Sequence, residues 1–248
     1  MLSNVLNKIF KNSRSSQKDG NFCRKISQIT TAKPLDISYY KLAFTHRSMN
    51  ILDNQGNPIN YERLEFLGDA MLNAVIASHL YLEVPSGDEG YLTKMRSKIV
   101  SRENLNSIGK SLGLIHIVES KMGNQQFGEN IHGNILEALI GAIYLDQGYP
   151  ACEKFIHQRL ISTIKDIQVL ETKITSYKSL LIEWCQKTKH TFKFDAYEES
   201  SNEDVKYFGV KLFIDNKLIS KGRATSKKKA EEKASQRAYF ALQEKINH

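Results

Sequence analysis

The chain has 248 residues, of which 41% are hydrophobic, so it is long enough for two domains that each bury a core. Its three cysteines are far apart in the sequence, which argues against a disulfide framework or a paired-cysteine metal motif and favours the reducing cytoplasm. No stretch approaches the roughly 18 apolar residues of a membrane span, and there is no glycine-rich phosphate loop, so we expect neither membrane association nor a small-molecule cofactor.

Positive charge gathers at both ends of the chain, whose formal net charge is +8. Residues 1–33 hold seven basic residues and one acidic residue, and their apolar face is short. We therefore expect a basic, flexible N-terminal arm, with an organelle transit peptide as the alternative. Residues 34–173 hold 13 basic and 16 acidic residues, whereas residues 174–248 hold 15 basic and 10 acidic residues. The basic ends suit a polyanionic partner, although charge alone does not distinguish RNA, DNA or a membrane surface.

Three acidic residues lie on one strip of a predicted helix that begins near Glu62. At about 100° per residue, Glu62, Glu65 and Asp69 fall within an arc of roughly 60°. The opposite side forms a predicted core-facing stripe of Leu64, Leu67, Met71 and Val75. None of the three acids has a basic residue four positions later. A divalent cation would make such a cluster tolerable, because Mg²⁺ prefers oxygen ligands; a solvated acidic face is the alternative.

A second predicted helix, over residues 131–144, carries one acid among apolar residues. Positions 135–145 are apolar or glycine on every side except for Glu137, so we expect this helix to be buried. A buried carboxylate needs a cation, a hydrogen-bond network or a bound proton to offset its lost hydration. Asn134 lies on the same face and adds an amide oxygen. A carboxylate bonded to a helix end or to His132 is the alternative, but it leaves the first acidic strip unexplained.

These two helices resemble segments of the ribonuclease III endonucleases, which cut double-stranded RNA. Residues 62–69 read Glu-Arg-Leu-Glu-Phe-Leu-Gly-Asp and match the signature helix of that family almost letter for letter. The supporting motifs follow in the family's order: Phe44-Thr45-His46-Arg47-Ser48, Asp88-Glu89-Gly90, Lys94-Met95-Arg96 and Glu137-Ala138-Leu139-Ile140-Gly141-Ala142. The resemblance extends over roughly residues 35–245.

The resemblance implies an all-α endonuclease domain over residues 34–168 that depends on Mg²⁺, with Mn²⁺ able to substitute. It also implies a homodimer with one acidic site per subunit. The implied reaction is hydrolysis of a phosphodiester in double-stranded RNA, which leaves 5′-phosphate and 3′-hydroxyl ends and a short 3′ overhang. The implied role is processing of ribosomal RNA precursors and other structured transcripts.

Residue by residue, the resemblance makes Glu65 and Glu137 metal ligands and Asp69 the carboxylate that is essential for hydrolysis. Two further acids belong to the outer part of the same acidic site: Glu62 and Glu89. Asn134 departs from the family, which usually has Asp at this position. An amide oxygen still ligates Mg²⁺, directly or through water, so we expect activity with weakened metal affinity or an altered metal preference.

The C-terminal part, residues 176–245, follows a predicted linker at residues 169–175 and has an α-β-β-β-α order. The predicted segments are a helix with Leu180, Leu181 and Trp184 at core spacing, strands at residues 192–194, 207–214 and 218–224, and a helix capped by Ser226 with Ala230, Ala234, Ala238 and Leu242 inward. Asp215 and Asn216 supply a turn between the last two strands. This order resembles a double-stranded RNA-binding domain, which is a small α+β fold.

The first turn of the last predicted helix holds three consecutive lysines: Lys227, Lys228 and Lys229. Their charge has the wrong sign for the helix dipole unless an anion binds there. The resemblance places them on the major-groove phosphates of an RNA duplex, with Lys221 in the same motif and Glu183 at the minor groove. Two departures predict weaker RNA binding than is typical: residues 199–204 lack the family's Gly-Pro-x-His loop, and Ile182 replaces a polar contact.

We therefore predict an endoribonuclease that acts on duplex RNA. Two alternatives remain open. A catalytically impaired RNA-binding protein of the same fold would require the acidic residues to be vestigial. A structural helical protein with an interaction module would show no response to divalent ions.

Overall fold

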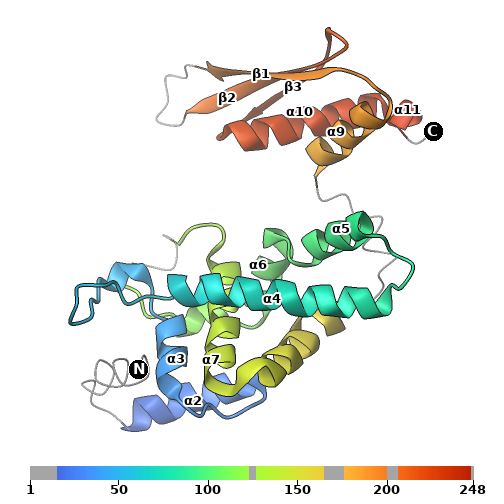
Figure 1. The fold of residues 1–248 in the computed structure, drawn as a ribbon. Helices are drawn as coiled ribbons and strands as arrows, with labels where there is room; N and C mark the ends of the chain where they lie inside the picture. Colours follow the sequence, from blue (N-terminus) through green and yellow to red (C-terminus); the bar gives the residue numbers. More distant parts are fainter. Residues whose placement is uncertain (1–15, 123–126, 165–175, 200–205, 247–248) are drawn as a thin grey trace. The chain divides into compact units, whose positions relative to one another are not determined.

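The computed structural model describes residues 16–122, 127–164, 176–199 and 206–246. The chain divides near residue 170 into two compact units, each with its own hydrophobic core (Figure 1). The described part of the first unit is mainly helical, whereas the second combines helices with a three-stranded sheet. The predicted fold class is confirmed. Within the described ranges, no helix is long and apolar enough to cross a membrane.

The first unit is built around two long helices, α4 (Glu62–Glu83) and α7 (Ile131–Arg159). Helix α7 kinks at Gly148, where φ is +79°, just before Pro150. The surrounding elements are α2 (Ser16–Thr30), α3 (Ile37–Ala43), η1 (Arg47–Met49), α5 (Glu89–Ile99), α6 (Arg102–Ser111), η2 (Leu114–Ile117) and η4 (Ile161–Thr163). Side chains cap three of these helices, because Asp36, Asp88 and Ser101 each accept a hydrogen bond from a backbone N–H of the following turn.

Glycines bring the backbones of α4 and α7 into direct contact. A Cβ atom on Gly68 would lie 1.7 Å from the carbonyl oxygen of Glu137, and one on Gly141 would lie 2.3 Å from the carbonyl oxygen of Leu64. We call this contact the glycine seam. The buried stripe of α4 follows the seam and comprises Leu64, Gly68, Leu72, Val75, Ile76 and Leu80.

The predicted stripe of α4 was therefore only partly right. Leu64 and Val75 are buried, but Leu67 and Met71 are only half-buried. The reason is that Gly68, which has no side chain and contributes nothing to an apolar pattern, lies at the centre of the contact with α7.

The expectation of a flexible arm over residues 1–33 is wrong for residues 16–30, which form α2. Ile26 is fully buried, and the ring of Phe22 packs edge-on against Phe44 with centroids 6.0 Å apart. The guanidinium of Arg159 donates to the carbonyl oxygen of Ile29 at 2.8 Å. Phe22, Ile26 and Ile29 recur at helical spacing, a pattern that the basic and polar composition of this segment obscured. Residues 1–15 lie outside the described residues.

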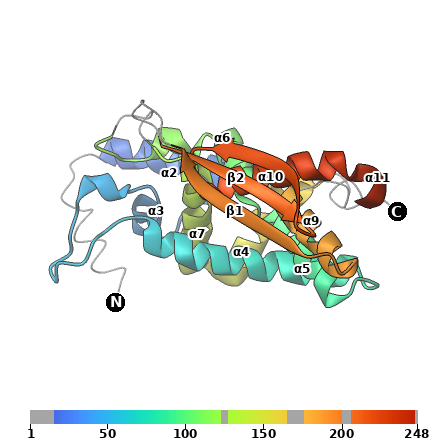
Figure 2. The same ribbon diagram turned by 90° about the horizontal axis from the view of Figure 1, so that it is seen from above.

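The second unit consists of α9 (Tyr177–Lys187), β1 (Phe192–Glu199), β2 (Tyr207–Ile214), β3 (Lys217–Ala224), α10 (Lys227–Ala241) and α11 (Gln243–Ile246). The strands are antiparallel in the order β1-β2-β3. The predicted turn is confirmed: Asp215 and Asn216 have φ values of 47° and 61°, as a two-residue hairpin turn requires. Figures 1 and 2 show α9 and α10 on the same face of the sheet.

The core of the second unit lies between that sheet face and the two helices. The predicted inward side of α10 is confirmed, since Ala230, Ala234 and Ala238 are fully buried. A Cβ atom on Gly222 would lie 2.1 Å from the carbonyl oxygen of Ala230, so α10 rests directly on β3. On α9 the fully enclosed residues are Leu181 and Cys185, whereas the predicted core positions Leu180 and Trp184 are half-buried.

Candidate active site

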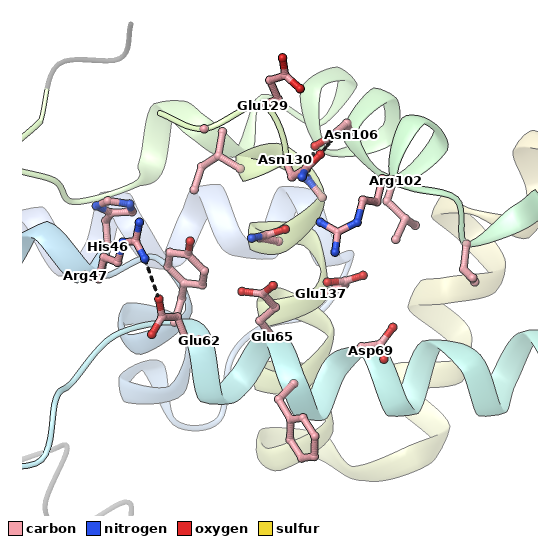
Figure 3. A pocket seen from close by; sticks show the side chains of 18 residues that line it. His46, Arg47, Glu62, Glu65, Asp69, Arg102, Asn106, Glu129, Asn130 and Glu137 are labelled. Atoms are coloured by element: carbon pink, nitrogen blue, oxygen red, sulfur yellow. Dashed lines mark hydrogen bonds and ion pairs between the residues drawn. The ribbon is translucent and has the colours of Figure 1, made fainter. Parts of the chain in front are cut away.

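A hollow of about 750 Å³ opens between α4, α6 and α7 in the first unit (Figure 3). Five of the residues predicted to form the acidic site line it: Glu62, Glu65, Asp69, Asn134 and Glu137. The opposite wall is formed by α6 and by the residues that precede α7, which contribute Arg102, Asn106, Glu129 and Asn130. The two predicted acidic helices therefore meet in a single site.

The glycine seam explains why these acids share one hollow. The backbone of Glu137 rests against Gly68, and Gly68 lies between Glu65 and Asp69 in the sequence of α4. The side chains of Glu65, Asp69 and Glu137 project into the space beside the seam (Figure 3). The distance between the two groups of acids is thus set by main-chain atoms in contact.

Burial and then electrostatic repulsion raise the pKa of two of these carboxyl groups. Burial, followed by the neighbouring Asp69 and Glu65 carboxylates, raises the pKa of Glu137 to about 7, although Arg102 opposes the shift. Burial and the Glu62 carboxylate raise the pKa of Glu65, again against the effect of Arg102. The site therefore holds more negative charge than Arg102 compensates.

The donor atoms fit a hard divalent cation. Carboxylate oxygens and an amide oxygen are the ligands that Mg²⁺ and Mn²⁺ accept, and a cation would relieve the repulsion around Glu137. As the side chains stand, no three acidic, histidine or cysteine residues in the described ranges converge closely enough to hold an ion. Glutamate side chains have three rotatable bonds, so the carboxylates of Glu65 and Glu137 can change position without movement of the backbone.

Hydrogen bonds hold the other site residues in place. The side-chain amide of Asn73 donates to Oδ1 of Asp69 at 2.9 Å. The amide of Asn134 is hydrogen bonded to the hydroxyl of Tyr61. Glu62 lies at the rim, where a guanidinium nitrogen of Arg47 is 3.6 Å from its carboxylate.

Glu89 does not line this hollow, and its place in the acidic site stays a prediction. It begins α5, is exposed, and accepts a hydrogen bond from Thr93 at 3.2 Å. Helix α5 follows the C-terminal end of α4, whereas Glu62, Glu65 and Asp69 lie on the first two turns of α4.

Sequence reasoning missed Arg102, a cation that lines the hollow and lowers the pKa of Glu65 and Glu137. It is the first residue of α6 and follows the cap residue Ser101. Nothing in that local pattern links it to Glu65 or Glu137. Asn73 was accessible to sequence reasoning, because it lies four residues after Asp69 on the same helix face.

In the second unit the three predicted lysines lie together at the exposed first turn of α10, where Ser226 Oγ accepts from the backbone N–H of Lys229. Lys227 and Lys228 line a shallow groove with Ile182 of α9. Two predicted RNA contacts lie outside that groove: Glu183 pairs with Lys187 at 3.1 Å, and Lys221 lies on β3. The loop predicted to weaken RNA binding lies largely outside the described residues, since residues 200–205 are not among them.

Comparisons with known proteins agree with both units. A family model described as "Ribonuclease-III-like" matches residues 36–164, and the "Double-stranded RNA binding motif" matches residues 177–242. A protein named Ribonuclease 3 from Zunongwangia profunda is 64% identical, and the match covers 95% of this chain and 97% of that protein. Ribonuclease 3 from Flavobacterium psychrophilum is 61% identical, and the match covers 98% of each chain.

Among solved structures, the ribonuclease III nuclease domain from Campylobacter jejuni is 28% identical, with a TM-score of 0.50. That match covers 58% of this chain and 96% of the other.

The matched regions coincide with the unit that carries the acidic hollow and with the unit that carries the exposed lysines. The predicted activity is confirmed: the chain is an endoribonuclease, and its partner is double-stranded RNA. The alternative of a structural helical protein is wrong. The chain belongs to the ribonuclease III family of metal-dependent endonucleases.

Proposed function

We propose that the hollow between α4, α6 and α7 holds Mg²⁺, with Mn²⁺ able to substitute, and that RNA phosphodiesters are hydrolysed there. The proposed ligand set is Glu65, Asp69, Asn134 and Glu137. The observation that carries this proposal is that Glu65 and Asp69 of α4 line the same hollow as Asn134 and Glu137 of α7, where burial and the neighbouring carboxylates raise the pKa of Glu137 to about 7. A site this negative attracts a polyanionic substrate only when cations are bound.

When bound, the cation supplies positive charge to the phosphate and lowers the pKa of a water molecule. In this proposal Glu65 and Glu137 hold the ion from two different helices. Asp69 is oriented by Asn73, whose amide donates to it at 2.9 Å, and it holds the attacking water. Arg102 adds a positive charge on the opposite wall, where the phosphate enters. The water oxygen bonds to phosphorus and gives up a proton to solvent, while the bond from phosphorus to the 3′ oxygen breaks and that oxygen takes a proton from solvent. The products have 5′-phosphate and 3′-hydroxyl ends.

The second unit is proposed to grip the duplex. Exposed lysines at the first turn of α10 present ammonium groups at the positive end of the helix dipole, which suits phosphate oxygens. An A-form helix hides its base edges in a deep groove, so such a grip selects shape rather than sequence. We assign residues 34–168 to the nuclease domain, 169–175 to a linker and 176–245 to the RNA-binding domain.

The proposed substrates are ribosomal RNA precursors and other structured transcripts in the cytoplasm. Both relatives at more than 60% identity are bacterial proteins named Ribonuclease 3. The described cysteines, Cys23, Cys152 and Cys185, are all free thiols, as in proteins of a reducing compartment.

Cleavage of a labelled 50-base-pair RNA tests the proposed metal dependence directly. We expect rapid cutting with Mg²⁺ or Mn²⁺, with 5′-phosphate ends, and no cutting in EDTA. Binding should persist in EDTA, because the lysines of the second unit do not need the ion. A protein that binds the duplex but never cuts it with either ion would overturn the proposal and favour the impaired alternative.

Asn134 provides a test of the ligand set. We expect Asn134→Asp to lower the Mg²⁺ concentration for half-maximal cleavage by about tenfold, because a charged ligand replaces a neutral one. The amide of Asn134 donates to the Tyr61 oxygen, and in the variant the Tyr61 hydroxyl donates to the new carboxylate instead, so the contact with Tyr61 is kept. The matched control is Asn130→Asp, which adds the same charge to the same hollow one turn earlier. Equal shifts in both variants would attribute the effect to net charge rather than to ligation.

We also propose that the enzyme is a homodimer that pairs through an apolar groove beside α4. The groove has a volume of about 830 Å³. Phe66 lies in its lining and is 80% exposed, and Leu145 on α7 is 40% exposed. The other apolar lining residues are Leu42, Pro58, Ile59, Leu64 and Leu67. An exposed aromatic beside an apolar groove is the self-complementary arrangement that a two-fold dimer needs.

Phe66→Ser tests this interface. We expect the dimer to weaken by about 2–4 kcal/mol, roughly a thirtyfold to thousandfold rise in the dissociation constant, as for an aromatic anchor at an interface. Sedimentation equilibrium at micromolar protein measures it. Tyr81→Ser is the matched control, because Tyr81 lies on the same helix, is 72% exposed and does not line the groove. An unchanged dimer in Phe66→Ser would refute the proposed interface.

A further inference from the structure

The sheet of the second unit has one face that α9 and α10 do not cover, and Figure 2 looks onto it. Along β2 and β3, alternate residues such as Val210, Leu212 and Ala224 are buried against the helices, so the residues between them point the other way. We call this second surface the open face. Its basic side chains are Lys193, Lys211, Lys221 and Arg223, and its aromatic side chains are Tyr197, Tyr207 and Phe213.

The open face is positively charged. It carries four cations against Asp195 among the described side chains. Lys211 and Lys221 are direct cross-strand partners, an arrangement of like charges that destabilises a sheet. Asp195 lies opposite Lys211 on the other side and offsets one of these charges. A bound anion would relieve the remaining repulsion.

Two tyrosines are held on this face by specific contacts. A Cβ atom on Gly209 would lie 2.3 Å from Cζ of Tyr197, so glycine is needed for this ring to lie across β2. The ammonium of Lys211 is 5.4 Å from the centroid of the Tyr197 ring, and the guanidinium of Arg223 is 4.2 Å from that of Tyr207. Tyr197 is 38% exposed, so its ring presents a flat apolar surface to solvent.

The open face continues into the lysine cluster of α10. A hollow of about 510 Å³ is lined by Tyr207 and Arg223 on one side and by Lys229 and Lys233 on the other. The acid in its wall, Glu232, accepts hydrogen bonds from the first residues of α9, at 2.6 Å from the Tyr177 backbone N–H. Basic groups therefore line a path from the proposed duplex grip to the sheet.

We propose that the open face binds a single strand of RNA that leaves the duplex held by α10. Lys211, Lys221 and Arg223 contact its phosphates, and a base stacks on Tyr197. The long side chain of Lys211 swings from the ring to a phosphate as the base takes its place. Single strands expose base faces for stacking, whereas a duplex buries them. The exposed ring of Tyr197 therefore favours a single strand over a second duplex as the ligand of the open face. The inference rests on the proposed duplex grip of α10.

Fluorescence anisotropy of the full chain in EDTA tests the phosphate contacts, with labelled 12-nucleotide oligouridine and a 30-base-pair duplex as separate probes. We expect Lys211→Gln/Lys221→Gln/Arg223→Gln to weaken oligouridine binding at least tenfold and to reduce its salt slope by about 2. The affinity of this triple variant for the 30-base-pair duplex should stay within twofold of wild type. The matched variant Lys227→Gln/Lys228→Gln should bind the duplex at least tenfold more weakly and keep its oligouridine affinity within twofold of wild type.

Tyr197 tests the stacking contact. Tyr197→Leu should weaken oligouridine binding by about 5- to 150-fold, whereas Tyr197→Phe, which keeps the ring, should bind within twofold of wild type. The inference is overturned if wild type does not bind oligouridine at low salt, or if the triple variant binds it normally. It is also overturned if both sets of variants lose both RNAs in parallel. Oligouridine binding without any duplex binding would instead refute the proposed grip of α10.

Discussion

Asp69→Asn is expected to slow the cleavage of duplex RNA by about a thousandfold or more while duplex affinity stays within twofold. The substitution keeps the size of the side chain and its hydrogen bond with Asn73, but it removes the charge. A metal site contributes several kcal/mol to transition-state stabilisation, and each 1.4 kcal/mol is a factor of ten in rate. Glu137→Gln should have a similar effect. Single-turnover cleavage and anisotropy binding measure the two quantities.

The matched control is Glu83→Gln. Glu83 is an exposed acid at the C-terminal end of α4, and it does not line the hollow. The Glu83→Gln variant loses the same charge from the same helix, so its rate of duplex cleavage should remain within twofold of wild type. If Asp69→Asn cuts at the wild-type rate, the acids of the hollow are not the hydrolytic site.

Stability should move in the opposite direction to activity in Glu137→Gln. At pH 8 the wild-type carboxylate is charged, half-buried and close to Asp69 and Glu65, so it destabilises the metal-free fold. Removing the charge should raise the free energy of unfolding in EDTA by about 1–2 kcal/mol after allowance for solvent screening. Added Mg²⁺ should stabilise wild type more than the variant, because it binds the folded state through this residue. A lower melting temperature for the variant in EDTA would contradict the repulsion argument.

Gly68→Ala is expected to reduce cleavage about a hundredfold although it adds only a methyl group. The new Cβ would lie 1.7 Å from the carbonyl oxygen of Glu137, so α4 and α7 must separate. Overpacking of this kind costs about 1–3 kcal/mol of stability, and a displacement of about 1 Å of reacting groups costs about a hundredfold in rate. Cleavage measured at 10 °C, together with circular dichroism to show that the variant is folded at that temperature, distinguishes displaced ligands from simple unfolding.

Gly20→Ala is the control for the seam. Gly20 lies within α2, and no atom would approach its Cβ within 4 Å. Alanine should therefore stabilise this helix by up to about 1 kcal/mol and leave cleavage within twofold. Wild-type cleavage in Gly68→Ala would show that the helix separation does not set the ligand spacing.

The acids of α4 were predictable because helical spacing alone puts Glu62, Glu65 and Asp69 on one strip. Glu137 was predictable because it is the one acid within an apolar helix. The spacing of residues along a helix does not predict which element each helix face packs against, because that depends on the tertiary packing of the helices. The joining of the two acidic faces follows from Gly68 and Gly141, which carry no apolar signal of their own.

The placements that could not be predicted have the same origin. Arg102 and Glu89 each begin a helix, and only the packing of α6 and α5 brings the first into the hollow and leaves the second outside. Lys221 belongs to the same sequence motif as Lys227, but strand alternation turns it to the open face. The local sequence pattern predicts on which side of a helix or strand a residue lies. Tertiary packing determines which other residues that side contacts.

The glycine seam has a consequence for how much the rest of the first unit can change. Because main-chain atoms set the distance between α4 and α7, no large side chain serves as the spacer there. Leu72, Ile76 or Leu139 can therefore be exchanged for other apolar residues of similar volume without moving the ligands, at a cost in stability rather than in rate. The apolar residues of this core can change during evolution while the geometry of the acidic hollow stays constant.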